Sequence, residues 1–439
     1  QLQKDIHKTF NLTKEYPIRV GVYELKDTKK TVLLVLIHHI AFDAWSGDIL
    51  FKELQKLYQG EVLKPLEIQY VDYANWQKTL DLDKGLHYWK NYLDGYEALN
   101  IATDYPRPKE LQYQGDSIDF EIDEILTQRI EQYAKTHGVT VYSLLLSMVS
   151  LLLAHYSGQD DIMIGSPVAN RNHPGTANLI GFFVNTLPLR IQLQTHQLFS
   201  EFVKKVHENE LACQNHQDIP LEKIIDIADV ERDTSRHPLF QVLFNLIHNK
   251  HQKQWLKPMD SDYSVSKFDI DFNFAIQEKT IAASIAYSTS LFEKQSITRM
   301  LESLQHLMTQ VLEVDNPIKS YQAITPHDYQ KVIIDWNQTG RNFPQKTLHQ
   351  LFIEQVAKTP NAIALVFEGK SLSYKELDEK SNQLANFILK QNLSPLIALC
   401  LERSLEMVIS ILAVLKAGCA YVPMDPGAPQ SRIKHMLDD

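Results

Sequence analysis

The stretch of residues 31–46 constrains the fold of this chain more than any other segment. Its first half holds a run of six consecutive apolar residues, which is too short to cross a bilayer and predicts a strand buried on both faces. His38 and His39 end the strand, and Asp43 follows them. We expect Ser46 to cap the amphipathic helix that comes next. Titratable side chains thus stand where a strand turns into a helix, a common place for reactive groups in α/β proteins.

The two histidines are expected to differ in role, because successive side chains of a strand point to opposite faces. One can face a cleft while the other packs into the structure. A histidine beside an apolar strand is most often a hydrogen-bonded core residue. Two adjacent histidines followed by an acid give a functional site and a core role about equal weight. Adjacent histidines on opposite faces make poor co-ligands, and no cysteine or further histidine is close in sequence, so no metal site is predicted.

The composition argues against several functional classes. Lys and Arg number 44 against 54 Asp and Glu, so the formal net charge is −10 and there is no basic footprint for nucleic acid. The three cysteines, Cys213, Cys400 and Cys419, are too widely spaced for a disulfide framework or a zinc module and fit a reducing cytoplasm. The apolar segment 139–156 is short for a membrane span and contains three serines, so we expect a buried helix. The N-terminus carries no signal-peptide pattern, and the chain looks like a fragment.

The length of 439 residues predicts about two to four domains. The polar segment 321–344 predicts a linker, although Val332–Ile334 and Trp336 within it are expected to dock on a surface. Beyond the linker, strands and helices alternate, which indicates the opening of an α/β domain.

In the part of the chain before the linker, Pro188 predicts an edge strand or a break. A hairpin is expected there over 16–36, with a polar turn at 26–30. Further strands are expected over 118–122, 161–168, 179–190, 239–247, 268–274 and 281–287. Helices are expected after Ser46, on both sides of Gly138, and over 198–213 and 292–314.

Taken in order, these segments resemble the condensation domain of nonribosomal peptide synthetases. Residues 38–46 are similar to the HHxxxDGWS signature of that family, with Ala44 where the family usually has Gly. If the backbone there needs a positive φ, Ala44 costs stability. Five further segments match in the order of the family, namely Tyr70–Gln77, Ile180–Arg190, His216–Glu222, Arg232–Phe240 and the strand through Asn245.

Residues 372–377 and 415–426 are similar to the first two signatures of adenylation domains, and 330–339 to the linker that joins the two domains. The resemblance therefore implies an α/β protein: the two-lobed, chloramphenicol-acetyltransferase-like condensation fold over 1–320, a linker over 321–344, and the N-terminal part of an adenylate-forming α/β domain over 345–439. Family members carry further residues ahead of Gln1, so the first lobe is expected to lack its N-terminal part. The adenylation part has no phosphate-binding loop and is not expected to activate amino acids, because ATP and Mg²⁺ serve only an intact domain.

The reaction that the resemblance implies is amide formation, in which an acceptor aminoacyl thioester attacks a donor acyl or peptidyl thioester. Both are held on phosphopantetheine arms, so upstream and downstream peptidyl carrier proteins and the adenylation domain of the same chain are the implied partners, and the condensation domain binds no cofactor. His39 matches the second family histidine and would act as base or positioner. His38 and Asp43 are assigned to structure. Arg171, or less favourably Arg190, is expected to pair with Asp43. Asn245 and Ser46 are the candidates for residues that face the substrate tunnel.

Alternatives from other classes remain. An epimerization domain shares the fold and the double histidine, but the adenylation start downstream disfavours it. A heterocyclization domain would carry aspartates in place of the histidines. A catalytically silent docking module for carrier proteins would not need His39. An enzyme that uses free coenzyme A thioesters, like chloramphenicol acetyltransferase, would not be fused to an adenylation start.

Overall fold

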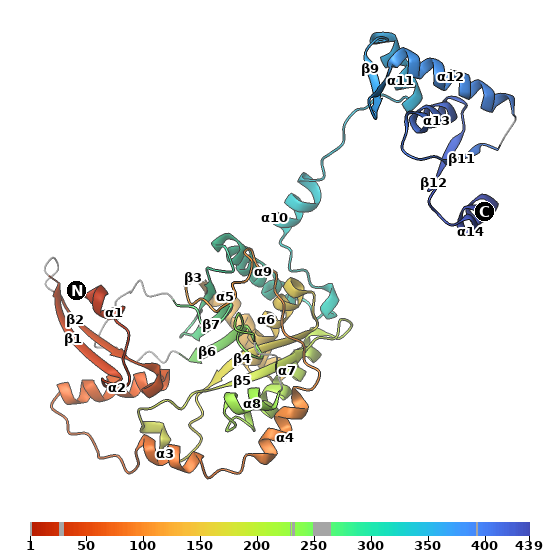
Figure 1. Cartoon of the computed structure of the whole chain (residues 1–439). Coiled ribbons are helices and arrows are strands. Elements are labelled where there is room, and N and C mark those ends of the chain that lie inside the picture. The colour runs from red at the N-terminus through yellow and green to blue at the C-terminus, as the bar shows by residue number, and fades with distance from the viewer. Residues whose placement is uncertain (1, 26–29, 229, 231–232, 249–264, 392–393) are drawn as a thin grey trace. The chain divides into compact units, whose positions relative to one another are not determined.

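The computed structural model describes residues 2–25, 30–228, 230, 233–248, 265–391 and 394–439. The turn expected at 26–30 lies outside these residues except for its last position, as does Arg232, which begins one of the matched segments. The chain divides into two compact units, Gln1–Asn337 and Gln338–Asp439 (Figure 1).

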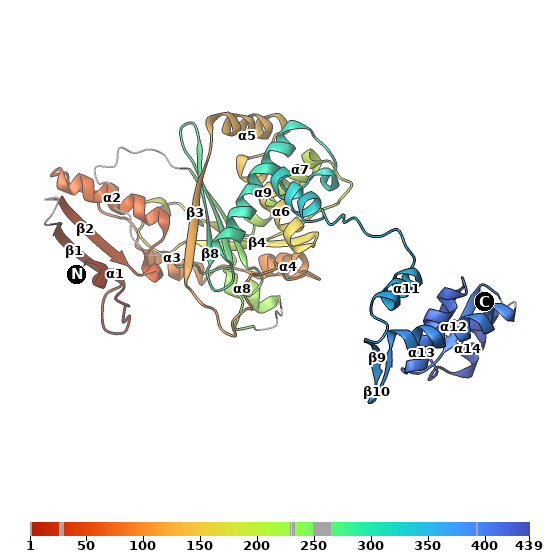
Figure 2. The same ribbon diagram turned by 90° about the horizontal axis from the view of Figure 1, so that it is seen from above.

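The first unit opens with a short helix, α1 (Leu2–Ile6), and the predicted antiparallel hairpin of β1 (Ile18–Leu25) and β2 (Lys30–Ile37). The prediction that β2 is buried on both faces is wrong, since residues 32–37 are only partly buried. The reason is that β1 and β2 pair only with each other among the described residues, so β2 is not an interior strand of a covered parallel sheet. A turn, η1 (His39–Ala41), then leads into helix α2 (Ala44–Tyr58) (Figure 2).

A mixed six-stranded sheet forms the centre of the first unit. Its two parallel pairs join β4 to β6 and β6 to β7, and the other pairs are antiparallel. Pro188 lies in β5 at the edge of the sheet, as predicted, where its missing N–H leaves no interior ladder bond unmade. In spatial order the strands are β3 (Gly115–Ile122), β8 (Ile281–Ser288), β7 (Ile270–Ile276), β6 (Val242–His248), β4 (Asp161–Val168) and β5 (Asn185–Gln192).

Helices cover one face of this sheet and bury the main core against it (Figures 1 and 2). They include α5 (Glu124–His137), α6 (Val141–Ser157) and α9 (Lys294–Glu313). As predicted, Gly138 separates the first two; its φ of 68° is the left-handed conformation that ends a helix. Within the described ranges no single helix is long and apolar enough to cross a membrane, and α5 with α6 reaches that length and apolarity only as a pair bent by 106°.

Four further helices surround the sheet edge at β5 and the approach to it. They are α3 (Tyr70–Gln77), α4 (Asp83–Tyr92), α7 (Phe199–Gln214) and α8 (Leu221–Ile227). The aromatic segment that begins at Tyr70 packs into a small separate core with Leu179 and Phe183. Segments that lie far apart in the sequence therefore meet beside the turn after β2.

The first unit ends in a short helix, α10 (Pro326–Tyr329), and a π-helical turn, η4 (Gln330–Asp335). The expectation that residues 332–334 and Trp336 dock on a surface is not met, since these side chains are 38 to 65% exposed. These two short elements pack mainly on each other and not on the six-stranded sheet.

The second unit has the predicted alternation of helix and strand, with a small core between α12 and α13. A hairpin of β9 and β10 comes first, and the parallel pair of β11 and β12 follows. In order the elements are α11 (Leu348–Lys358), β9 (Ile363–Phe367), β10 (Lys370–Ser373), α12 (Tyr374–Lys390), β11 (Leu396–Cys400), α13 (Leu405–Lys416), β12 (Ala420–Met424) and α14 (Gln430–Asp438).

Candidate active site

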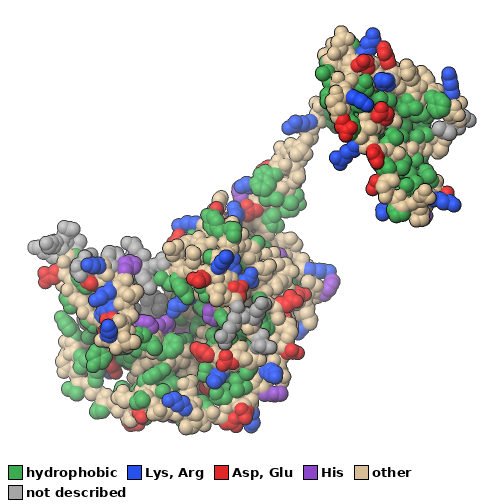
Figure 3. Space-filling model, viewed as in Figure 1, with side chains coloured by type: hydrophobic (Ala, Val, Ile, Leu, Met, Phe, Trp, Pro, Cys, Tyr) green, Lys and Arg blue, Asp and Glu red, His purple; other side chains and the backbone are tan. Residues whose placement is uncertain are grey.

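A cleft of about 3480 Å³ opens in the first unit between the N-terminal hairpin and the uncovered face of the six-stranded sheet. The space-filling view shows a hollow there, with histidine side chains at its border (Figure 3). Among the residues that line it are His38 and His39 from the turn after β2, Phe182 from the loop before β5, and Asn245 from β6. Residues of the HHxxxD-like stretch thus face the same space as a residue from the opposite wall.

His39 lies exposed in the turn that follows β2, with its ring edge-on to Phe182 at a centroid distance of 5.0 Å. Its Nδ1 lies 2.6 Å from the carbonyl oxygen of Phe42. Because a carbonyl oxygen can only accept, Nδ1 must carry the proton. In the neutral ring Nε2 therefore holds a lone pair, and no residue in the described part of the chain hydrogen-bonds to it.

His38 is held in the opposite tautomer. Its Nδ1 accepts a hydrogen bond from the backbone N–H of Ile40 at 3.1 Å, so the neutral ring carries its proton on Nε2. Its backbone N–H donates to the carbonyl of Pro17 at 2.8 Å, and its ring is edge-on to Phe10. His38 is half-buried and caps the turn on which His39 stands, so of the two rings His39 alone offers a free basic nitrogen.

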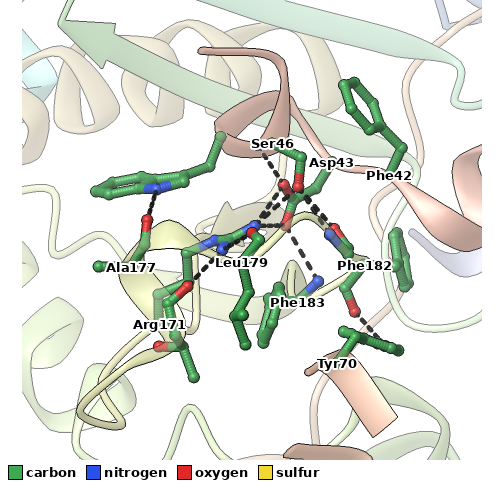
Figure 4. Close-up of polar contacts among 12 residues, drawn as sticks. Phe42, Asp43, Ser46, Tyr70, Arg171, Ala177, Leu179, Phe182 and Phe183 are labelled. Carbon is green, nitrogen blue, oxygen red and sulfur yellow. Dashed lines mark hydrogen bonds and ion pairs between the residues drawn. The ribbon is translucent and has the colours of Figure 1, made fainter. Parts of the chain in front are cut away.

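Asp43 and Arg171 form a buried ion pair directly behind this turn (Figure 4). Nη2 of Arg171 donates to both carboxylate oxygens of Asp43, at 2.9 and 3.1 Å, and the side chains are only 3 and 4% exposed. The backbone N–H groups of Ser46 and Phe183 donate to the same carboxylate. Burial by itself raises the pKa of Asp43, but these hydrogen bonds and the charge of Arg171 outweigh it and hold the pKa below its usual value.

Arg171 also fixes the loop that carries Phe182. Its Nη1 donates to the carbonyls of Thr176 and Leu179, both at 2.7 Å, and its guanidinium lies 4.1 Å from the ring centroid of Phe183. One cation therefore ties the start of α2 to the loop before β5. Arg190, the second arginine considered for Asp43, instead pairs with Asp161 at 2.7 Å.

The assignment of Ser46 as helix cap and as tunnel residue is wrong. The helix cap of α2 is Asp43, which accepts from the N–H of Ser46. Ser46 is fully buried and does not border the cleft. Its hydroxyl donates to the carbonyl of Gly181 and accepts from the N–H of Gly181 and from Arg171. With every bonding direction used inside the protein, this hydroxyl has none left for a substrate.

Ala44 fits its position without backbone strain. It is the first residue of α2, and its φ is not among the positive values found at non-glycine residues of the chain. The side chain is exposed at the border of the cleft. The alanine in this otherwise matching stretch therefore carries no conformational cost.

Sequence reasoning did not single out Phe182 or the contacts of Trp45 and Tyr70. The indole of Trp45 donates to the carbonyl of Ala177 at 3.0 Å, and the hydroxyl of Tyr70 to that of Phe182 at 2.7 Å (Figure 4). A Cβ on Gly181 would overlap the ring of Tyr70, so glycine is needed at that close approach. The signal was present, since Trp45, Tyr70 and Gly181 all fall in matched segments, but nothing in the sequence pairs these segments.

Comparison with known families decides the identity of the first unit. Residues 1–333 match the condensation domain family. The chain belongs to this family. Residues 352–439 match the family of AMP-binding enzymes, so the condensation domain continues into an adenylation segment. The predicted family and the predicted mixed α/β fold are confirmed.

Sequence relatives are peptide synthetases. The chain is 37% identical to malpinin synthetase of Mortierella alpina and 36% identical to gramicidin S synthase 2 of Brevibacillus brevis, with all of the chain covered in both cases. It spans only 6 and 10% of the length of these two relatives. The condensation domain assignment supports peptide-bond formation, and none of these matches favours the alternatives.

Solved structures agree on the fold. A four-domain nonribosomal peptide synthetase, crystallised with AMP and glycine, superposes with a TM-score of 0.86 at 25% identity over all of this chain and 35% of that one. The condensation domain of the monacolin K polyketide synthase superposes with a TM-score of 0.61 at 20% identity, over 70% of this chain and 76% of that one. The second likeness concerns the fold alone.

Proposed function

We propose that the first unit joins a donor acyl or peptidyl thioester to the amine of an acceptor aminoacyl thioester, with both substrates on the phosphopantetheine arms of carrier proteins. The observation that carries this proposal is the free Nε2 of His39 at the border of the cleft, in a chain of the condensation domain family. An amine is a competent nucleophile towards a thioester once it is unprotonated, so placement and proton removal are the tasks left to the protein.

His39 is the proposed catalytic residue. Its Nε2 would accept a proton from the attacking ammonium group, or a hydrogen bond from the amine that is formed. The bond from Nδ1–H to the carbonyl of Phe42 supports this role, because it fixes the tautomer in which Nε2 carries the lone pair. The C–N bond forms as the C–S bond breaks, and the proton that the amine nitrogen loses on acylation passes to the donor sulfur, which leaves as the free thiol of its pantetheine arm.

His38, Asp43 and Arg171 are proposed as positioning residues. None of them offers a free basic group, since Asp43 and Arg171 satisfy each other and His38 caps its own turn. They fix the turn and the loop between which His39 stands. Asn245 borders the cleft from the sheet and is the proposed tunnel residue of the opposite wall.

The partners proposed are upstream and downstream peptidyl carrier proteins and the adenylation segment of the same chain, with a domain boundary within 321–344. The condensation domain would bind no cofactor of its own. The segment 345–439 is proposed not to activate amino acids alone, because we expect it to lack the motifs that bind ATP and Mg²⁺. A cytoplasmic location is proposed from the three cysteines, all of which are free thiols.

The test uses this chain, or the longest natural form of it that can be produced, with two carrier proteins that bear different aminoacyl groups. Mass spectrometry should detect the dipeptide on the acceptor carrier. In D₂O the donor α-carbon should take up no deuterium, since proton exchange there is the signature of epimerization. Deuterium uptake without dipeptide would replace the proposal by that alternative, and binding of both carriers with neither product would favour the docking module.

A further inference from the structure

Asp271 carries a partly buried carboxyl group that the proposed reaction leaves unused. It lies on β7 and borders the cleft on the sheet side, as Asn245 does. Its Oδ1 is buried and has no hydrogen-bond partner in the described part of the chain. A buried polar atom without a partner is costly. Because the residue is partly exposed and borders the cleft, its carboxylate can gain a partner from a ligand there.

Among the residues that the structure describes, none forms an ion pair with Asp271. Asp269, two residues away, is occupied by a bidentate ion pair with Arg107. Lys267 borders the cleft with an exposed side chain and forms no ion pair with Asp271 within 4.0 Å. The neighbours across the sheet, Leu243 on β6 and Ala286 on β8, are not titratable.

The protonation of Asp271 agrees with this isolation. Burial raises its pKa to about 7, Lys267 lowers the pKa and Asp269 raises it again. Near neutral pH the group is therefore divided between a neutral acid and an uncompensated carboxylate. A cation in the cleft would favour the carboxylate and complete its hydrogen bonding at the same time.

We propose that Asp271 binds a positively charged nitrogen of the acyl substrate in the cleft and thereby selects the substrate. This inference rests on the proposed function for the class of ligand, an acyl group on a pantetheine arm. The nitrogen has two sources: the α-ammonium group of the aminoacyl unit, or an amine in its side chain. Both present the same N–H donors and the same charge to the carboxylate.

Four pantetheine amides, which cannot react because nitrogen replaces the thioester sulfur, separate the two sources. Norleucyl-pantetheine amide carries the α-ammonium group alone, Nα-acetyl-lysyl-pantetheine amide the side-chain amine alone, lysyl-pantetheine amide both, and Nα-acetyl-norleucyl-pantetheine amide neither. Their affinities for the chain are measured by isothermal titration calorimetry at pH 8.

The variant is Asp271→Asn, which keeps the shape and removes the charge. Asp119→Asn is the matched control, because Asp119 lies on β3 on the same sheet face, through its register with Ser284, but is exposed and outside the cleft. Asp271→Asn should weaken the analogues that carry the bound nitrogen by about 10- to 100-fold and leave the neutral one unchanged, as expected for a hydrogen bond to a charged group. Asp119→Asn should change none of them.

The pattern identifies the nitrogen. A loss confined to analogues with a free α-ammonium group supports the first source, and a loss confined to those with the lysine side chain supports the second. Affinities of Asp271→Asn within twofold of the wild type for all analogues overturn the inference, as does a wild type that binds no cationic analogue. A second measurement needs no variant: where the side-chain amine is the bound nitrogen, the affinity of the wild type for Nα-acetyl-lysyl-pantetheine amide, relative to the neutral analogue, should rise between pH 6 and 8 as Asp271 ionises.

The two proposals fail separately. Unchanged binding in Asp271→Asn, together with dipeptide formation by the wild type, refutes the role of Asp271 and leaves amide formation standing. Selective loss of cation binding in Asp271→Asn, together with a wild type that forms no dipeptide, supports the role of Asp271 and refutes amide formation.

Discussion

Removal of the Asp43 carboxylate should destabilise the first unit more than any comparable surface change. The Asp43→Ala substitution leaves the Arg171 guanidinium, 3% exposed, without its counter-charge, and removes the cap of α2. Breaking a buried ion pair from one side costs about 3 to 5 kcal/mol, and a lost helix cap about 1 kcal/mol. The two terms overlap at the Ser46 N–H, so we predict a loss of about 4 kcal/mol in the free energy of unfolding.

Urea unfolding followed by tryptophan fluorescence measures this loss. All five tryptophans of the sequence fall within residues 1–337, so the signal reports on the first unit alone. Glu124→Ala is the matched control, because Glu124 pairs with Lys279 at 3.0 Å while both side chains are largely exposed, and its loss should cost less than about 1 kcal/mol.

A double substitution tests the cause. Asp43→Ala combined with Arg171→Met removes the uncompensated charge and should cost less than the sum of the single changes by about 2 kcal/mol or more. The pKa of Asp43 is depressed in the folded state, so the contribution of the pair is present above its unfolded pKa and fades as the pH falls below it. An Asp43→Ala variant no less stable than Glu124→Ala would refute the reasoning.

Two further predictions concern buried polar groups. Ser46→Ala removes a hydroxyl that bonds Gly181 twice and Arg171 once, so the same urea assay should show a loss of about 2 kcal/mol, and a loss below about 0.5 kcal/mol would contradict its place in the network. Asp271 has a folded-state pKa raised to about 7. The folded state therefore holds its proton more tightly than the unfolded one, and the wild type should lose up to roughly 4 kcal/mol relative to Asp271→Asn as the pH rises from about 4 to 7. A difference that does not vary with pH would refute it.

Much of the site could be predicted because its parts are local in sequence. His39 and Asp43 fall within one strand-turn-helix, and their spacing, read with the downstream matches, indicated a site of the condensation type. The choice between Asp43 and Ser46 as helix cap could not be made locally, since both residue types cap well. Arg171 decides it, because its charge and the N–H of Phe183 draw the carboxylate into the cap position and leave Ser46 to bond Gly181.

Other features depend on tertiary arrangement. An apolar run such as residues 32–37 predicts a strand but not the number of layers that cover it, and in this chain the described hairpin has only two strands. Asp271 lies in an alternating strand whose polar face would ordinarily be solvated. Its burial follows from the cleft wall formed by β6 and β7, which no pattern within the strand reveals. The loop that brings Phe182 to His39 is held by hydrogen bonds from Tyr70 and Arg171, which come from distant parts of the sequence.

The central claim is that the free Nε2 of His39 carries out the proton step of amide formation. The direct measurement is the single-turnover rate of dipeptide formation between two loaded carrier proteins, for the wild type, His39→Ala and His38→Ala, with urea unfolding to establish that each is folded. We predict that His39→Ala slows the step by about 100-fold or more and that His38→Ala, if folded, slows it less. A folded His39→Ala variant that forms dipeptide within about threefold of the wild-type rate would contradict the account.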